Sequence, residues 1–165
     1  MANRIPHSRD LRRGRDSRTG GYYFLTTSVA GRRPIFRHPE NATMMVNALR
    51  WINDAKRFFV DAAVVMPDHL HLAGRLGEGS LASVMHTLKS FTANQLVGNG
   101  VMSPVWQDGY HDHQLRDDED YGVHVRYLIE NPTRAGLVEH LDDYPYLIFP
   151  DWWCDQVAPG RRSHK

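Results

Sequence analysis

The sequence has few of the features that mark secreted or membrane proteins. It contains a single cysteine, Cys154, so it can form neither an internal disulfide nor a thiolate metal cluster. Its first 21 residues carry charges where a signal peptide needs an apolar core, and no segment approaches the roughly 18 apolar residues of a membrane span. These absences predict a protein of a reducing cytoplasm that has no membrane partner.

Length and composition predict one globular domain. The chain has 165 residues, 41% of them hydrophobic and 24% charged, which is close to the average of folded proteins. We find no internal repeat and no low-complexity segment. The expected division is a basic N-terminal arm at 1–20, a domain at 21–149 that carries the chemistry, and a C-terminal tail at 150–165.

The net charge of +1 hides an uneven distribution. Residues 1–37 hold nine arginines against two aspartates, which gives +7, so the remainder carries 1 − 7 = −6. Arginine offers paired donors to phosphate oxygens, and its binding to nucleic acid releases counterions. The basic segment therefore predicts phosphate contacts. A solvated tail is the alternative, and charge alone does not separate the two.

Periodicity predicts an α+β fold. Strand patterns and helix patterns alternate in the order β-α-β-β-α-β-α, which is the ferredoxin-like split βαβ arrangement with an extra C-terminal helix. We expect a four-stranded antiparallel sheet with two helices on one face. The residues after 137 are poorly periodic and should pack partly through Trp152 and Trp153. The segments are strands at 21–31, 58–66, 70–76 and 104–116, and helices at 38–58, 80–100 and 117–131.

Two histidines stand two residues apart, one directly before and one inside the strand expected at 70–76. His69 and His71 should project from one face while Leu70 points into the core, so both imidazoles can share one metal ion. Asp68 should point to the opposite face, which moves the search for a third ligand elsewhere. The alternative is a pair of solvated polar residues. His111 and His113 have the same spacing, but the residue between them is an aspartate and does not anchor a strand.

The last predicted helix carries a tyrosine on its polar side. Its core-facing stripe excludes Tyr127, which falls with His124 and Asn131 on the opposite surface. Asn131 lies four residues after Tyr127, at the negative end of the helix dipole, and its amide oxygen could be the missing ligand. A phenol beside a divalent ion is a potential nucleophile toward phosphate. The alternative is an exposed tyrosine above a helix-ending asparagine.

Together these motifs resemble a known family. The segments are "YYFLTTSVAGRRPIF", "VVMPDHLHL", "VWQDGYHDHQLRDDEDYGVHVRYLIENPTRAGLV" and "YPYLIFPDW", and they extend from about Tyr22 to Phe149. The sequence resembles the single-tyrosine HUH (His-hydrophobe-His) transposases, and more closely their REP-associated tyrosine transposase branch. The combination of MP-D-HLH with Y-x₃-N-P-x-R-A-G-L is more specific than either half.

The resemblance implies an activity. His69, His71 and Asn131 would hold Mg²⁺ or Mn²⁺, and Tyr127 would form a 5′-phosphotyrosine with release of a 3′-hydroxyl. The substrate would be single-stranded DNA with a palindromic-repeat hairpin. The protein would be a bacterial, cytoplasmic, nucleoid-associated monomer or homodimer. Asparagine is a shorter ligand than the glutamine of some related transposases.

The resemblance also suggests DNA contacts. Trp106 and Tyr110 could stack on unpaired bases, although core packing is an equal alternative for the tryptophan. His111 and His113 could form a second contact patch or the rim of the site, and Arg134 either touches the scissile phosphate or ends the helix. The arginines expected to hold phosphates are Arg12, Arg13, Arg15, Arg32 and Arg33.

Three other functions fit parts of the pattern. The first is a repeat-hairpin DNA-binding protein or repressor of the same fold with little or no cleavage, since such sheets also serve as plain nucleic-acid platforms. A plasmid-type nicking protein would share the chemistry but usually has a longer chain. A metal-dependent hydrolase would use water, so its activity would survive Tyr127→Phe.

Overall fold

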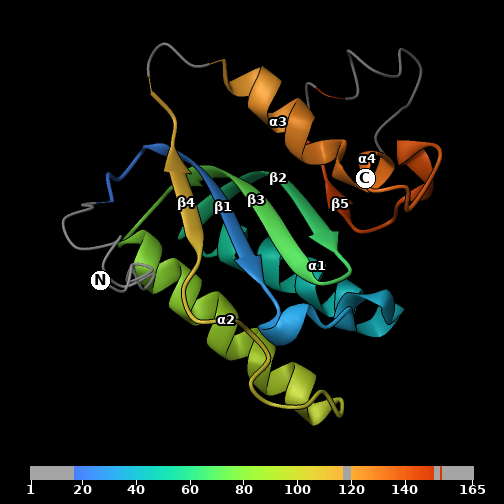
Figure 1. Ribbon diagram of the computed structural model, residues 1–165. Helices are drawn as coiled ribbons and strands as arrows, with labels where there is room; N and C mark the ends of the chain where they lie inside the picture. The colour runs from blue at the N-terminus through green and yellow to red at the C-terminus, as the bar shows by residue number, and fades with distance from the viewer. Residues whose placement is uncertain (1–16, 117–119, 151–152, 154–165) are drawn as a thin grey trace, which may run out of the picture.

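The computed structural model describes residues 17–116, 120–150 and 153. Its centre is an antiparallel sheet of five strands in the order β4-β1-β3-β2-β5. Helices α1 (Pro39–Asp54) and α2 (Leu81–Gly98) cover one face, and α3 (Tyr121–Ile129) and α4 (Asn131–Arg134) lie over the other (Figure 1). The strands are β1 (Tyr22–Ser28), β2 (Phe58–Met66), β3 (His69–Leu76), β4 (His111–Gln114) and β5 (Leu147–Ile148).

The ferredoxin-like prediction is confirmed for the first four strands and their two helices. The order β4-β1-β3-β2, with α1 and α2 packed together on one face, is the split βαβ arrangement. The fifth strand, β5, was not predicted. It has only two residues, which pair with Ala63 and Val64 of β2, and this length is too short to show a period of two.

Alternation along β1 and β3 builds the main core. Leu25 of β1 and Leu70 and Leu72 of β3 are almost completely buried and face α1 and α2. The residues between them point to the other side of the sheet, because successive side chains of a strand alternate. Two histidines are therefore presented by a strand whose opposite face is anchored in the core.

Local signals in the sequence set the starts of the two core helices. Pro39 occupies the first turn of α1, where its missing N–H leaves no hydrogen bond unmade. The Ser80 hydroxyl accepts a hydrogen bond from the Ser83 N–H at 3.2 Å and caps α2. Both helix starts agree with the sequence prediction.

A smaller core holds α3 against the other face of the sheet. Val125, Leu128 and Ile129 of α3 pack with residues of β2 and β3, which confirms the predicted stripe. The Tyr121 hydroxyl donates to Asp61 Oδ2 of β2 at 2.5 Å and fixes the first turn of the helix. Trp153 is buried in the same cluster, as predicted, whereas Trp152 lies outside the described residues.

Two predicted elements have different bounds. The strand expected at 104–116 is reduced to β4, and Trp106 makes a single bridge with Val29. The last helix begins at Tyr121, where Asp120 caps it, and it is followed at once by α4. Pro132 therefore does not end the helical segment, because a proline in the first turn of α4 needs no N–H partner.

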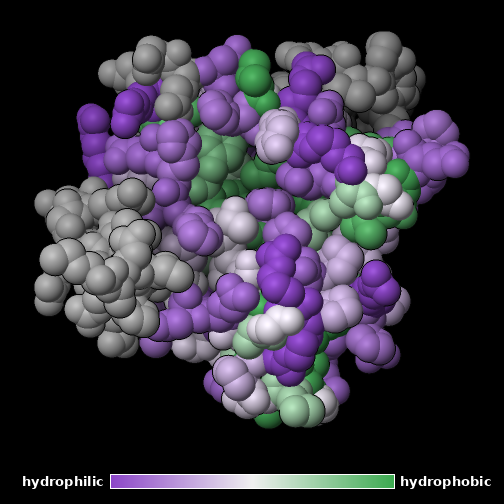
Figure 2. Space-filling view, viewed as in Figure 1, coloured by the Kyte–Doolittle hydropathy of each residue, from purple (hydrophilic) through white to green (hydrophobic). Residues whose placement is uncertain are grey.

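Within the described part of the chain, none of the helices combines the length and the apolarity needed to span a bilayer. Figure 2 shows a face that is mostly hydrophilic, with hydrophobic side chains exposed in small patches.

We predict that Leu70→Ala destabilises the fold by about 2–5 kcal/mol, because the side chain between the two histidines is almost completely buried. Leu137→Ala is the matched control, since Leu137 is 37% exposed. Urea unfolding followed by circular dichroism measures both. Equal effects of the two substitutions would contradict the assignment of Leu70 as the anchor of β3.

Candidate metal and nucleophile site

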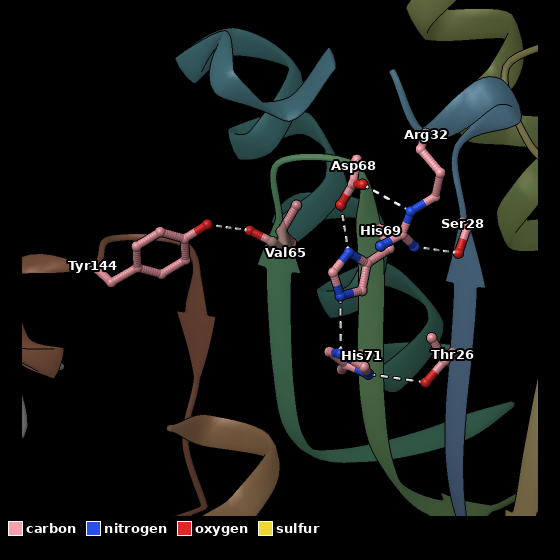
Figure 3. Close-up of polar contacts among 8 residues, drawn as sticks. All are labelled: Thr26, Ser28, Arg32, Val65, Asp68, His69, His71 and Tyr144. Carbon is pink, nitrogen blue, oxygen red and sulfur yellow. Dashed lines mark hydrogen bonds and ion pairs between the residues drawn. The ribbon is translucent and has the colours of Figure 1, made fainter. Parts of the chain in front are cut away.

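The two histidines of β3 meet on the sheet face that α1 and α2 leave uncovered. His71 lies opposite Thr26 of β1, and His69 lies opposite Ser28. Their Nε2 atoms are 3.0 Å apart and their rings stand almost perpendicular to each other, at 87° (Figure 3). The spacing in the sequence therefore does bring both imidazoles to one point.

The Nδ1 atom of each ring makes a hydrogen bond to a neighbouring side chain. His69 Nδ1 lies 2.6 Å from Asp68 Oδ1, and His71 Nδ1 lies 2.9 Å from Thr26 Oγ1 (Figure 3). The prediction that Asp68 points to the opposite face is wrong. Asp68 belongs to the turn between β2 and β3, before the alternation of β3 begins, so its carboxylate is free to turn back onto the first histidine.

The contact with Asp68 determines which nitrogen of a neutral His69 ring carries the hydrogen. An ionised carboxylate can only accept, so His69 Nδ1 carries the hydrogen and donates it to Asp68, and Nε2 keeps its lone pair. That lone pair faces His71 Nε2 at 3.0 Å. The two atoms are compatible either if His71 donates a hydrogen bond or if both lone pairs are directed at one cation.

The donor pair fits a divalent cation. Two donors at right angles on an ion with bonds of about 2.1 Å stand about 3.0 Å apart, which is the separation of the two Nε2 atoms. Hydrogen bonding of the opposite ring nitrogen is also typical of metal-binding histidines. Within the described residues, however, no group of three or more His, Cys, Asp or Glu side chains gathers at one point. Further ligands would therefore have to be of another kind.

The environment of His71 favours its neutral form. Burial of the ring, followed by the electrostatic influence of the neighbouring His69, lowers the pKa of His71 from 6.5 to about 4. The charges of Arg134 and Arg32 act in the same direction. A neutral imidazole is the form that binds metal, so His71 is ready to act as a ligand at neutral pH.

Tyr127 lies on the exposed side of α3, as the helix periodicity predicts. Its side chain is 64% exposed, and the Arg134 guanidinium carbon stands 3.6 Å from the centre of its ring. Arg134 Nη2 also donates to the Tyr127 carbonyl at 2.7 Å. Arg134 thus contacts both the ring and the backbone carbonyl of Tyr127.

The charge of Arg134 acts on both the Tyr127 ring and His71. The arginine that stacks on Tyr127 is close enough to His71 for its charge to lower the pKa of that imidazole. Helix α3 itself packs on β2 and β3, the strand that carries both histidines. The tyrosine and the imidazoles therefore belong to one region of one sheet face.

Tyr121, the other tyrosine of α3, is a poor candidate for the nucleophile. Burial, and then the hydrogen bond that its hydroxyl donates to Asp61, raise the pKa of Tyr121 above its ordinary value. A buried, strongly bound phenol is held as a structural group, whereas Tyr127 is open to a substrate.

Asn131 keeps its place beside Tyr127, although the helix is interrupted between them. Its amide nitrogen donates to the Leu128 carbonyl at 2.9 Å and to the Tyr127 carbonyl at 3.4 Å. The amide nitrogen is the donor in both hydrogen bonds. The amide oxygen is therefore the atom of this side chain that could bind a metal. Asn131 as a metal ligand stays a prediction.

Relatives with known names match most of the chain. It is 28% identical over 132 residues to the REP-associated tyrosine transposase of Escherichia coli K12, covering 79% of this chain and 77% of that protein. It is 29% identical over 147 residues to a Haemophilus influenzae protein provisionally given the same name, with 82% and 83% covered. No family model matches the sequence.

A solved structure supports the same relationship. A REP-associated tyrosine transposase bound to a REP hairpin superposes with a TM-score of 0.69 and 27% identity, over 81% of this chain and 79% of that one. Sequence and fold therefore point to the same relatives. The chain is a relative of the REP-associated tyrosine transposases.

In this relative of the REP-associated tyrosine transposases, two of the expected DNA-contacting arginines are engaged within the protein. Arg32 binds Asp68 and Ser28, each at 2.9 Å. Arg33 donates to the carbonyls of Ala30, Met102 and Pro104. Its guanidinium joins two loops. A phosphate-binding role for Arg32 and Arg33 stays a prediction. Arg12, Arg13 and Arg15 lie outside the described residues.

The aromatic and histidine candidates separate into core and surface. Trp106 is 8% exposed and its indole N–H donates to Thr92 at 3.0 Å, so the core-packing alternative is the one observed. Tyr110 packs partly against the same core. His111 and His113 are exposed on β4, opposite Thr26 and Phe24 of β1. They therefore lie on the sheet face that carries the β3 histidine pair.

We predict that His71 makes the fold sensitive to acid. Because its pKa of about 4 in the folded protein is below 6.5, the unfolded chain takes up the proton first. Stability contributed by neutral His71 is complete above pH 6.5 and is lost as pH falls toward 4, by up to about 3 kcal/mol.

Urea unfolding in EDTA at a series of pH values tests this dependence. His71→Gln should flatten the loss of stability between pH 6.5 and 4, and His140→Gln is the matched control for loss of an imidazole. Parallel curves for wild type and His71→Gln would contradict the prediction.

Proposed function

We propose that this chain is a metal-dependent transposase that nicks single-stranded DNA beside a REP-like hairpin and joins itself to the DNA through Tyr127. The observation that carries the proposal is the pair of Nε2 atoms 3.0 Å apart, fixed through their opposite nitrogens, on the sheet face over which α3 presents an exposed tyrosine. A protein that only bound DNA would need neither feature.

The proposed reaction is a transesterification at phosphorus. The Tyr127 oxygen attacks the scissile phosphorus and loses its proton to solvent, and the bond from phosphorus to the 3′-oxygen breaks. The 3′-oxygen takes up a proton and leaves as a hydroxyl, while the 5′-phosphate stays on the tyrosine. A second 3′-hydroxyl can then displace the tyrosine, so rejoining needs no external energy source.

His69 and His71 would hold the divalent ion, with Asn131 as the proposed third ligand. Mg²⁺ or Mn²⁺ bound there would neutralise charge on the phosphate and polarise it toward attack. Arg134, stacked on the Tyr127 ring, is placed to steady the phenol and to contact the same phosphate with its exposed guanidinium.

The proposed substrate rests on the relatives and on the charge distribution. The structural relative was solved bound to a REP hairpin. In this chain, the arginines at 12, 13 and 15 would contact phosphates, and Tyr110, His111 and His113 would line the path of the unpaired strand. The first 37 residues carry a net +7, which suits a polyanionic partner.

We predict that Tyr127→Phe abolishes a covalent adduct with DNA. Wild-type protein, Mn²⁺ and a labelled single-stranded repeat hairpin should give a band that survives denaturation, and Tyr22→Phe should keep it as the control for an exposed tyrosine. His69→Ala should reduce the adduct by at least about 100-fold, because one of two imidazole ligands is lost.

Other outcomes of the same gel identify the alternative functions. If DNA is cleaved without formation of an adduct, and if cleavage persists in Tyr127→Phe, the protein is a hydrolase that uses water. Binding of the hairpin with no cleavage by wild-type protein would indicate the DNA-binding protein or repressor. An adduct retained by Tyr127→Phe would contradict the assignment of the nucleophile.

We predict that Arg15→Gln lowers the salt dependence of hairpin binding. Loss of one phosphate contact on single-stranded DNA should reduce the slope of log K against log salt concentration by about 0.7. Fluorescence anisotropy with a labelled hairpin between low and moderate salt measures the slope. An unchanged slope and affinity would remove Arg15 from the proposed DNA contacts.

A further inference from the structure

Arg32 adopts an unusual backbone conformation next to the histidine pair. Its φ of 55° lies in the left-handed region, directly after Gly31 with φ of 65°. Residues with a Cβ rarely adopt this region, and when they do, the surrounding contacts have to hold them there. The contacts of the Arg32 side chain are therefore informative.

The Arg32 guanidinium joins two elements at the edge of the site. Its Nε lies 2.9 Å from Asp68 Oδ2, and its Nη1 donates to Ser28 Oγ at 2.9 Å (Figure 3). Asp68 offers its other oxygen, Oδ1, to His69 Nδ1 at 2.6 Å. One carboxylate is thus bound by the arginine on one oxygen and by the histidine on the other.

The turn that carries Asp68 is held independently of this side chain. The Val29 N–H donates to the Asp68 carbonyl at 2.9 Å, and the Phe36 N–H donates to the Pro67 carbonyl at 3.0 Å. The backbone of the turn does not depend on Arg32. What the arginine fixes is the direction of the Asp68 carboxylate.

We propose that Arg32 is a positioning residue for the metal pocket, and that it acts through Asp68 on His69. This inference rests on the proposed metal site, and the expectation that Arg32 contacts DNA stays a separate prediction. With Arg32 in place, Asp68 holds the hydrogen of His69 on Nδ1 and keeps the Nε2 lone pair pointed at His71.

Without the arginine, the carboxylate can rotate toward solvent. The His69 ring then loses the acceptor that fixes its tautomer, and a fraction of the molecules carries the hydrogen on Nε2, where it blocks metal binding. The expected consequence is weaker metal affinity with little change in the fold.

The first test reads the tautomer of His69 in the metal-free protein. Two-dimensional ¹⁵N NMR of labelled histidines at pH 7.5 in EDTA should show His69 of the wild type with its hydrogen on Nδ1. Arg32→Gln and Asp68→Asn should shift both ring nitrogens toward values of mixed tautomers, and Arg32→Lys should restore part of the wild-type pattern. Arg37→Gln, which removes another exposed arginine charge, should leave the spectrum unchanged.

The second test measures Mn²⁺ affinity by calorimetry in a double-mutant cycle. Asp68→Asn should weaken binding by about 10-fold or more, and Arg32→Gln by a smaller factor. In the Asp68→Asn background, Arg32→Gln should have almost no further effect, because the arginine acts through the carboxylate.

Arg32→Gly separates positioning from a structural role. Glycine adopts a φ of 55° without strain, so the melting temperature should stay close to that of the wild type while Mn²⁺ affinity falls as in Arg32→Gln. Equal loss of melting temperature in Arg32→Gly and Arg32→Gln, with no change in the His69 tautomer, would overturn the proposal.

Two outcomes distinguish this inference from the proposed function. If the His69 tautomer and Mn²⁺ affinity depend on Arg32 but Tyr127 forms no adduct, the positioning role stands and the strand-transfer proposal fails. If an adduct forms and the Arg32 variants keep the wild-type tautomer and Mn²⁺ affinity, the positioning role is wrong.

Discussion

The hydrogen bonds to the rear nitrogens of His69 and His71 are the constraint on which the site depends. Two imidazoles on one strand would otherwise rotate independently and present either nitrogen. Asp68 and Thr26 form hydrogen bonds with the two Nδ1 atoms. The two Nε2 atoms therefore face each other at 3.0 Å. Thr26 comes from β1 and Asp68 from the β2–β3 turn, so the central pairing of the sheet sets the geometry of the pocket.

One face of the sheet supplies most of the hydrophobic core, and the other face carries the candidate site. One face is buried under α1 and α2 and contains most of the core, including the leucines that alternate with the histidines. The other face is covered only in part by α3, through a smaller cluster centred on Val125 and Ile129. Polar side chains can therefore remain accessible beside a well-anchored strand, and an exposed tyrosine can approach them from the helix above.

Much of this could be predicted from the sequence, and the exceptions have physical reasons. Alternating apolar residues predicted the strands β1 and β3, and the helix period predicted that Tyr127 lies outside the core. Contacts that depend on turn geometry could not be predicted from periodicity, which is why the predicted direction of the Asp68 side chain is wrong and the contact between Arg32 and Asp68 was not predicted. Burial of Trp106 depends on a tertiary partner, Thr92, that no local pattern identifies.

The central claim is that the histidine pair and Tyr127 form one site. It is tested most directly by placing 3-fluorotyrosine at position 127 and titrating Mn²⁺ while recording ¹⁹F spectra. We expect the Tyr127 resonance to broaden strongly as the ion binds, and to remain sharp in His69→Ala at the same Mn²⁺ concentration. A sharp Tyr127 resonance in protein saturated with Mn²⁺ would show that the phenol and the bound ion are remote, and would contradict the account.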